Sequence, residues 1–257
     1  MSSFMLLAAA LFGAIVGSFC NALSFRLGTG RVATLFSPTS SGRSRCMRCG
    51  HVLSPRDLVP VFSWLFLRGR CRYCRARISM QYPLVEAAAA VLAAGVYIQS
   101  PDPLHFVFWL VVWMTLLFTL VYDLRHKIIP LSCSVLLGAL GLVYVWTLGF
   151  SVWSLLAGPL VAAPLLLLSL VSGGRWMGWG DGLLELGLGW LLGVSAGASA
   201  LAIAFWSGAA VGIVLMIRQS GYTMKSELPF APFLILGAGV AYFLHVDFFQ
   251  TLPALFL

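Results

Sequence analysis

The amino-acid sequence predicts an all-α polytopic membrane protein with about eight transmembrane helices and a small cytoplasmic domain between helices 1 and 2. The 257 residues are 60% hydrophobic and only 9% charged, and their mean hydropathy is +0.96. Soluble globular domains carry about 25% charged residues, so the composition excludes an ordinary soluble fold. At about 20 residues for each spanning helix, the chain has room for roughly eight spans and one modest extramembrane region.

Eight apolar segments are candidates for the spanning helices. We expect them at residues 4–25, 83–99, 104–122, 128–148, 152–172, 182–194, 198–217 and 229–246. The sixth segment is short for a bilayer, and the block 182–217 is too long for a single helix. Gly193, Ser195 and Gly197 offer a break within that block.

The positive charges indicate the topology. Eleven of the 16 Lys and Arg residues fall between Arg26 and Arg77. The other five follow the third, fifth and seventh expected spans, and they are Arg125, Lys127, Arg175, Arg218 and Lys225. Cytoplasmic loops concentrate Lys and Arg. Eight spans with both termini outside place all sixteen on the cytoplasmic side, so we expect this topology.

The chain is expected to have three parts. Residues 1–25 form the first transmembrane helix, which we expect to be retained because no basic segment precedes its apolar run and it is longer than a signal-peptide core. Residues 26–81 are the one long polar segment and form the cytoplasmic domain. Residues 82–257 form a membrane-embedded domain.

Four cysteines in the polar segment have the spacing of a zinc site. Cys46 and Cys49 form one C-x-x-C pair, and Cys71 and Cys74 form another after 21 intervening residues. A two-residue gap lets both thiolates of a pair bind one tetrahedral ion, and two pairs complete a four-sulfur site. Two disulfides are the alternative, but disulfides rarely persist in the cytoplasm. Four thiolates leave no open position for water, so we expect a structural ion.

The basic residues around these cysteines would also suit a zinc ribbon that binds nucleic acid. However, the segment is attached to the membrane at both ends, and juxtamembrane arginines commonly meet anionic lipid headgroups. We therefore expect the lipid bilayer, and not nucleic acid, as the partner of this basic segment.

Two aspartates lie at the cytoplasmic ends of expected spans. Asp123 ends the third span, and Asp181 opens the sixth within Gly178-Trp-Gly-Asp181. Two carboxyl groups brought close together cannot both ionise easily. Such a pair can activate a water and protonate the carbonyl or the leaving amine, which is aspartic-protease chemistry. The alternatives are that Asp181 caps its helix and that Asp123 pairs with Arg125 or Lys127.

Six motifs carry a resemblance to a known family. They are Gly17-Ser-Phe-Cys-Asn21, the two cysteine pairs with Arg68-Gly-Arg before the second, Ile78-Ser79 with Tyr82-Pro-Leu-Val-Glu86, Asp123 with Pro130, Gly178-Trp-Gly-Asp181, and Leu228-Pro-Phe-Ala-Pro-Phe233. In this order they resemble bacterial type IV prepilin peptidases, which are also called prepilin leader peptidases/N-methyltransferases and belong to aspartic peptidase family A24. The resemblance covers nearly the whole chain.

The resemblance implies an integral membrane aspartic endopeptidase of the bacterial inner membrane. Such enzymes cut the leader from type IV prepilins and pseudopilins on the cytoplasmic side, with Asp123 and Asp181 as the catalytic pair and zinc on the four cysteines. Many members then methylate the new N-terminus with S-adenosylmethionine, and the resemblance places Glu86 near that cofactor. A hydrogen bond between helices, or an ion pair with an arginine of the cytoplasmic segment, is the alternative role of Glu86.

The sequence departs from the family pattern around the aspartates. The family usually has Lys where this chain has Leu183, and acidic residues are frequent where it has Leu131 and Arg125. Glu185 is an addition, and it would share a helix face with Asp181 four residues before it. We expect these changes to shift the pH optimum, with a polar contact between helices as the alternative role of Glu185.

Two other classes of function remain open. The motif G-x-G-D also occurs in presenilin-like intramembrane proteases, which are not expected to carry the zinc module. A non-enzymatic transporter or assembly scaffold would use intramembrane carboxylates as proton carriers. Internal repeats would favour a transporter, and we find none in the sequence. A prepilin cleavage assay separates these classes.

Overall fold

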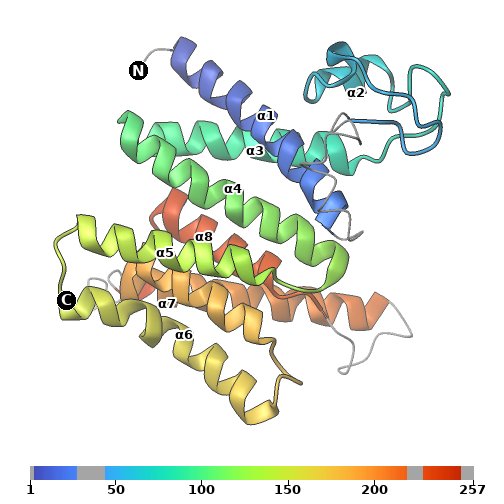
Figure 1. Cartoon of the computed structure of the whole chain (residues 1–257). Helices are drawn as coiled ribbons and strands as arrows, with labels where there is room; N and C mark the ends of the chain where they lie inside the picture. Colours follow the sequence, from blue (N-terminus) through green and yellow to red (C-terminus); the bar gives the residue numbers. More distant parts are fainter. Residues whose placement is uncertain (1–2, 28–43, 219–227, 250–257) are drawn as a thin grey trace. The chain divides into compact units, whose positions relative to one another are not determined.

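A computed structural model describes residues 3–27, 44–218 and 228–249 (Figure 1). Within these ranges the chain forms helices and two isolated β-bridges, and no strand. Packing divides the chain into two compact units, Met1–Val121 and Tyr122–Leu257. The predicted all-α class is confirmed, whereas the division into residues 1–25, 26–81 and 82–257 stays a prediction.

Five helices are long and apolar enough to cross a membrane. They are α1 (Ser3–Leu27), α3 (Gln81–Gln99), α4 (Pro103–His126), α6 (Val152–Ser172) and α7 (Trp179–Arg218). Two apolar helices are shorter, α5 (Leu131–Thr147) and α8 (Ala231–Leu244), and the short helices η2 (Pro55–Asp57) and α2 (Phe62–Phe66) lie in the cysteine-containing segment. The chain is thus a multi-pass membrane protein, and the number of eight spans stays a prediction.

The longest helix, α7, is interrupted where the sequence predicts a break. Gly193 has φ 80° and ψ 174°, a backbone conformation outside the helical region and open essentially to glycine alone. The interruption falls at the end of the expected sixth span, 182–194. The two expected spans of this block therefore correspond to the two halves of α7.

In the first unit, α1 and α3 pack through small residues. A Cβ on Gly17 would overlap Ala89, and one on Gly13 would overlap Ala93. The hydrophobic effect contributes little to the association of apolar helices in lipid. The pair is favoured by van der Waals contact, which small residues permit because they let the two backbones approach closely. Figure 1 shows α1 and α3 side by side.

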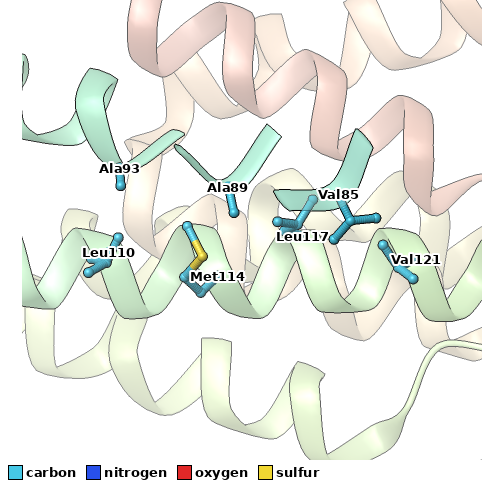
Figure 2. Packing of buried hydrophobic residues seen from close by; sticks show 7 residues of the cluster. All are labelled: Val85, Ala89, Ala93, Leu110, Met114, Leu117 and Val121. Carbon is cyan, nitrogen blue, oxygen red and sulfur yellow. The ribbon is translucent and has the colours of Figure 1, made fainter. Parts of the chain in front are cut away.

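A second helix pair of this unit packs valine and alanine side chains of one helix against mostly larger apolar side chains of the other (Figure 2). The buried residues of this cluster are Val85, Ala89 and Ala93 on α3 and Leu110, Met114, Leu117 and Val121 on α4. Their spacing of three and four residues places each set on one face of its helix. This packing fixes α3, which carries Glu86.

In the second unit, α5, α6 and α8 each pack against α7. The Trp190 side chain of α7 lies against Gly141 of α5 and Gly158 of α6, where no larger side chain would fit. Its indole N–H also donates to the carbonyl oxygen of Leu155 at 2.8 Å. These contacts fix the first half of α7, which carries Asp181 and Glu185.

Candidate functional site

The four cysteines predicted to bind zinc lie together. Their sulfur atoms are all within 4.8 Å of one another, and Cys46 Sγ is 3.7 Å from Cys74 Sγ. A tetrahedral ion with Zn–S bonds of about 2.3 Å separates its ligands by about 3.8 Å. All four are free thiols, so the structure does not contain the two alternative disulfides. The cluster could hold a single metal ion.

Two similar turns build this cluster. The N–H of Gly50 donates to the carbonyl of Cys46 at 2.9 Å, and the N–H of Arg75 donates to that of Cys71 at 3.0 Å. The residue after the second cysteine of each pair has positive φ, 70° at Gly50 and 58° at Arg75. An isolated antiparallel β-bridge closes each turn. Local backbone geometry therefore presents the sulfur atoms without support from a long helix or a sheet.

One thiol of the cluster is prepared for metal binding by its own turn. The backbone N–H groups of Cys49 and Arg48 donate to the sulfur of Cys46, and they lower the pKa of its thiol from 9.0 to about 6. The thiolate is the form that binds a metal ion. The donor set and its spacing thus fit zinc chemistry.

Asp57, which none of the motifs in the sequence indicated, supports the second turn. Its carboxylate accepts hydrogen bonds from Arg72 Nε at 2.7 Å, Tyr73 Oη at 3.2 Å and Ser54 Oγ at 2.8 Å. Burial by itself would raise the pKa of Asp57, but these bonds outweigh it and lower the pKa to about 2. The spacing Ser54-x-x-Asp57 is that of a capping box, which is the signal that could have found this residue.

Asp181 lies in the first turn of α7. Its backbone N–H donates to the carbonyl of Gly178 at 3.2 Å, and its carboxylate accepts a hydrogen bond from the N–H of Gly178. An acidic residue at the third helical position caps a helix in this way. Asp181 therefore caps its helix, as the alternative interpretation states, but it does so from the third helical position and not from the N-cap. A Cβ at Gly178 would lie 3.1 Å from Oδ2 and crowd the carboxylate.

Asp123 lies in the last turn of α4 and is buried, with 4% of its surface exposed. Its carboxylate accepts a hydrogen bond from the backbone N–H of Ala231, the first residue of α8. This partner is a helix N-terminus, where a negative charge is favoured. Pairing of Asp123 with Arg125 or Lys127 stays an alternative. Its second oxygen, Oδ2, has no hydrogen-bond partner among the described residues.

The structure brings the two aspartates together in one unit. The charges of Asp123 and Asp181 interact, although 58 positions separate them in the chain. Glu185 lies one helical turn after Asp181 and interacts with it. Glu185 is 1% exposed, and its Oε1 has no hydrogen-bond partner within the described ranges. The arrangement is a set of three neighbouring carboxyl groups, two of them at helix N-termini.

Glu86, the residue predicted to lie near a cofactor, belongs to the other unit. Its side chain is on α3, is 7% exposed, and accepts a hydrogen bond through Oε2 from the backbone N–H of Val61 at 2.7 Å. The alternative role of Glu86 was a hydrogen bond between helices. Glu86 does accept a hydrogen bond, but the donor is a backbone N–H of the cysteine-containing segment and not a group on another spanning helix. A role toward S-adenosylmethionine stays a prediction.

Comparisons with known proteins identify the family of this chain. The family model described as the bacterial peptidase A24 N-terminal domain matches residues 11–100. The prepilin leader peptidase/N-methyltransferase of Aeromonas hydrophila is 32% identical over an alignment that covers 90% of this chain and 88% of that protein. The chain belongs to the prepilin leader peptidase/N-methyltransferase family.

Two further members of this family have similar identities over most of the chain. The protein of Burkholderia pseudomallei (strain 1026b) is 35% identical over 82% of this chain and 70% of its own length. That of Stutzerimonas stutzeri is 30% identical over 91% of this chain and 89% of its own length. No solved structure matched the chain. The predicted prepilin leader peptidase/N-methyltransferase family, and with it the prediction of an enzyme, is confirmed.

Proposed function

We propose that this protein is an aspartic endopeptidase that removes the leader from type IV prepilins and pseudopilins at the cytoplasmic face of the bacterial inner membrane. The interaction between Asp123 and Asp181 is the observation that carries the proposal. Family membership supports the substrate class. The positions of the 16 basic residues support an orientation with both termini outside and the cysteine cluster and aspartates inside.

The aspartate pair acts on a water and the scissile peptide bond. One carboxylate takes a proton from the water as its oxygen attacks the carbonyl carbon, and the other, protonated, donates to the carbonyl oxygen. The carboxyl group that took the proton from water then donates it to the leaving nitrogen as the C–N bond breaks. A hydroxyl of the tetrahedral diol returns its proton to the other carboxylate as the carbonyl re-forms, so the pair again holds one proton. The unpartnered Oδ2 of Asp123 has a hydrogen-bonding position free for this chemistry.

The backbone before Asp181 supports access of an extended substrate. Residues 173–178 between α6 and α7 are not helical, and α7 begins at Trp179. Gly173 and Gly174 both have positive φ. Non-helical backbone at the membrane edge retains hydrogen-bonding groups that an extended peptide can pair with.

Zinc is the ion that we propose for the four cysteines. When bound, it would join the two C-x-x-C turns and stabilise a segment that has few buried apolar residues of its own. Cys46, Cys49, Cys71 and Cys74 fill all four positions of a tetrahedral site. The ion therefore has a structural role and takes no part in peptide cleavage.

Methylation of the new N-terminus with S-adenosylmethionine is the second activity that we propose, and the family supports it. When bound, this cofactor supplies the methyl group. Glu86 is the residue that we propose on the cofactor side, and its hydrogen bond to Val61 uses Oε2 alone. Glu86→Gln keeps an oxygen that can accept from Val61, so loss of methylation with normal cleavage in this variant would support a cofactor role. Normal methylation would remove that role.

The peptidase proposal is tested with purified protein in nanodiscs and a prepilin substrate. Asp123→Asn and Asp181→Asn are each expected to abolish cleavage, because neither amide can exchange protons as the carboxyl pair does. Asp102→Asn is the matched control, since Asp102 is an exposed aspartate that pairs with His105 and belongs to the other unit of the chain. Cleavage by either amide variant would contradict the aspartic mechanism. Absence of cleavage by the native protein would favour a scaffold or a different intramembrane protease.

A further inference from the structure

The cysteine-containing segment exposes an apolar surface around α2. Its members are Leu58 (41% exposed), Val59 (45%), Phe62 (53%), Leu65 (56%) and Phe66 (84%). Scattered apolar residues are common at protein surfaces, but Val59, Phe62 and Phe66 border one pocket, and apolar residues gathered in this way mark an interaction site. We call these five residues the α2 apolar surface.

The position of this surface is fixed against a membrane-spanning helix. Val61, at the start of α2, has φ 61°, an unusual conformation for a β-branched residue. The backbone N–H of Val61 donates a hydrogen bond to the carboxylate of Glu86. Glu86 lies five positions after the first residue of α3, which is about 7–8 Å along the helix axis. The buried carboxylate thus holds α2 beside the first two turns of a span, at the depth where headgroups meet acyl chains.

A second contact fixes the rotation of α2. The indole N–H of Trp64 donates to the carbonyl of Ile78 at 3.2 Å, three residues before α3 begins. The same indole packs over Gly69, where a Cβ would lie 2.7 Å from the ring. Trp64 therefore faces the segment's own backbone, and Phe62 and Phe66 remain exposed.

Positive charge surrounds the α2 apolar surface. Residues 44–80 contain eight arginines and a single acidic residue, Asp57. A pocket of about 220 Å³ is bordered by Arg56 and Arg72 together with Val59, Phe62 and Phe66. Arg72 binds Asp57 through Nε, and half of its side chain remains exposed. Arginine and phenylalanine side chains that border one pocket match the phosphate groups and acyl chains of anionic lipids, whereas a basic peptide would be repelled.

We propose that the α2 apolar surface inserts into the headgroup–acyl boundary of the membrane leaflet that α3 enters, with Arg56 and Arg72 on the phosphates of anionic phospholipids. This insertion attaches the cysteine-containing segment to the bilayer at a third point, in addition to its chain connections to α1 and α3. It also gives Glu86 a positioning role that is independent of the proposed peptidase and methyltransferase activities.

Photo-crosslinking of the full-length protein tests this proposal. Phe66→p-benzoylphenylalanine is placed in nanodiscs of mixed phosphatidylcholine and phosphatidylglycerol, irradiated, and analysed by mass spectrometry for lipid adducts. Met47→p-benzoylphenylalanine is the matched control, because Met47 is 80% exposed in the same segment but lies in the first cysteine turn. Zinc content identifies variants that remain folded.

Lipid adducts at position 66 are expected to exceed those at position 47 several-fold. The fraction of lipid adducts that contain phosphatidylglycerol is expected to exceed the mole fraction of this lipid in the bilayer. Arg56→Gln is expected to reduce this excess. Equal lipid labelling at both positions would overturn the insertion. Crosslinks from position 66 to a second copy or to another protein would overturn the choice of lipid as partner. An excess of phosphatidylglycerol that Arg56→Gln leaves unchanged would overturn the role of the arginine.

Discussion

Glu185 lies one helical turn after Asp181 on α7 and interacts with it, yet the two carboxyl groups differ in exposure. Glu185 is 1% exposed, whereas Asp181 is partly exposed at the start of the helix. A change in the protonation of one carboxyl group therefore alters the electrostatic environment of the other. We therefore predict that the pH dependence of cleavage depends on three carboxyl groups and not on two.

Glu185→Gln removes an ionisable group beside the aspartate pair without changing the size of the side chain. We expect cleavage to continue, because Asp123 and Asp181 remain, with a pH–rate profile displaced by about half a pH unit or more. The measurement is kcat/KM for a prepilin peptide between pH 5 and pH 9. Asp102→Asn, which removes an exposed carboxylate elsewhere, is expected to leave the profile in place. Identical profiles for the native protein and Glu185→Gln would mean that Glu185 is only a packing contact.

The second prediction concerns the packing that positions Asp181. A Cβ on Gly189 would lie 2.9 Å from Gly158 Cα and 3.0 Å from the Ala157 carbonyl oxygen, so Gly189→Ala forces α6 and α7 apart. We expect a loss of about 1–3 kcal/mol of stability, or roughly 3–10 °C in Tm, together with slower cleavage. Tm is measured by tryptophan fluorescence in detergent micelles.

Gly212→Ala is the control on the same helix, because a Cβ at Gly212 meets no atom within 4 Å. This variant is expected to be neutral or slightly more stable, since alanine favours the helix. Equal destabilisation by both substitutions would show that the close approach at Gly189 is not what holds α6 against α7.

Features that depend on nearby residues in the sequence could be predicted. The cysteine cluster follows from two C-x-x-C pairs, because each turn is built from hydrogen bonds within its own loop. The interruption of α7 at Gly193 follows from the glycines in an apolar block too long for one helix. The expected span limits 128–148 and 229–246 were slightly too wide. Hydropathy alone does not show where these helices begin and end. Pro130 is the N-cap of α5, and His245 is the C-cap of α8 with φ 52°.

Features that depend on a backbone partner from a distant segment could not be predicted. The sequence identified Asp123 as an intramembrane carboxylate, but the hydrogen bond that this carboxylate accepts comes from the backbone N–H of Ala231 at the start of α8. Likewise, nothing in the type or spacing of residues indicates that Glu86 binds the N–H of Val61. Any backbone N–H can serve in such contacts, so the partner is decided by tertiary packing and leaves no signal in the sequence.

The third prediction concerns metal removal. Cys49→Ser is expected to reduce bound zinc from about one ion per chain to near zero and to unfold the segment around the cluster, because three remaining thiolates bind the ion far less tightly. Zinc is measured by inductively coupled plasma mass spectrometry, and local unfolding by hydrogen exchange of residues 44–80. Cys20→Ser is the control, since Cys20 lies in α1, outside the cluster. An unchanged zinc content in Cys49→Ser would contradict the four-sulfur site.

The fourth prediction concerns Asp57, whose hydrogen bonds to Arg72, Tyr73 and Ser54 lower its pKa to about 2 from an ordinary value of 3.8. A carboxyl group with a lowered folded-state pKa stabilises the fold above its unfolded-state pKa, and this stabilisation is lost as the pH falls through the folded-state value. Asp57→Asn is therefore expected to lower the free energy of unfolding by about 1–2 kcal/mol at pH 7, after allowance for the half-exposed Arg72.

The difference between Asp57→Asn and the native protein is expected to stay constant from pH 8 to about pH 5 and to decline only below about pH 4. Thermal unfolding of both proteins across this range, with zinc present, measures it. Arg72→Gln is expected to destabilise the native protein in the same pH range, but to have little further effect in the Asp57→Asn background, because the two side chains stabilise the second cysteine turn through one contact. A difference that already disappears near pH 6 would assign the stabilisation to another group, and additive effects of the two substitutions would contradict the shared contact.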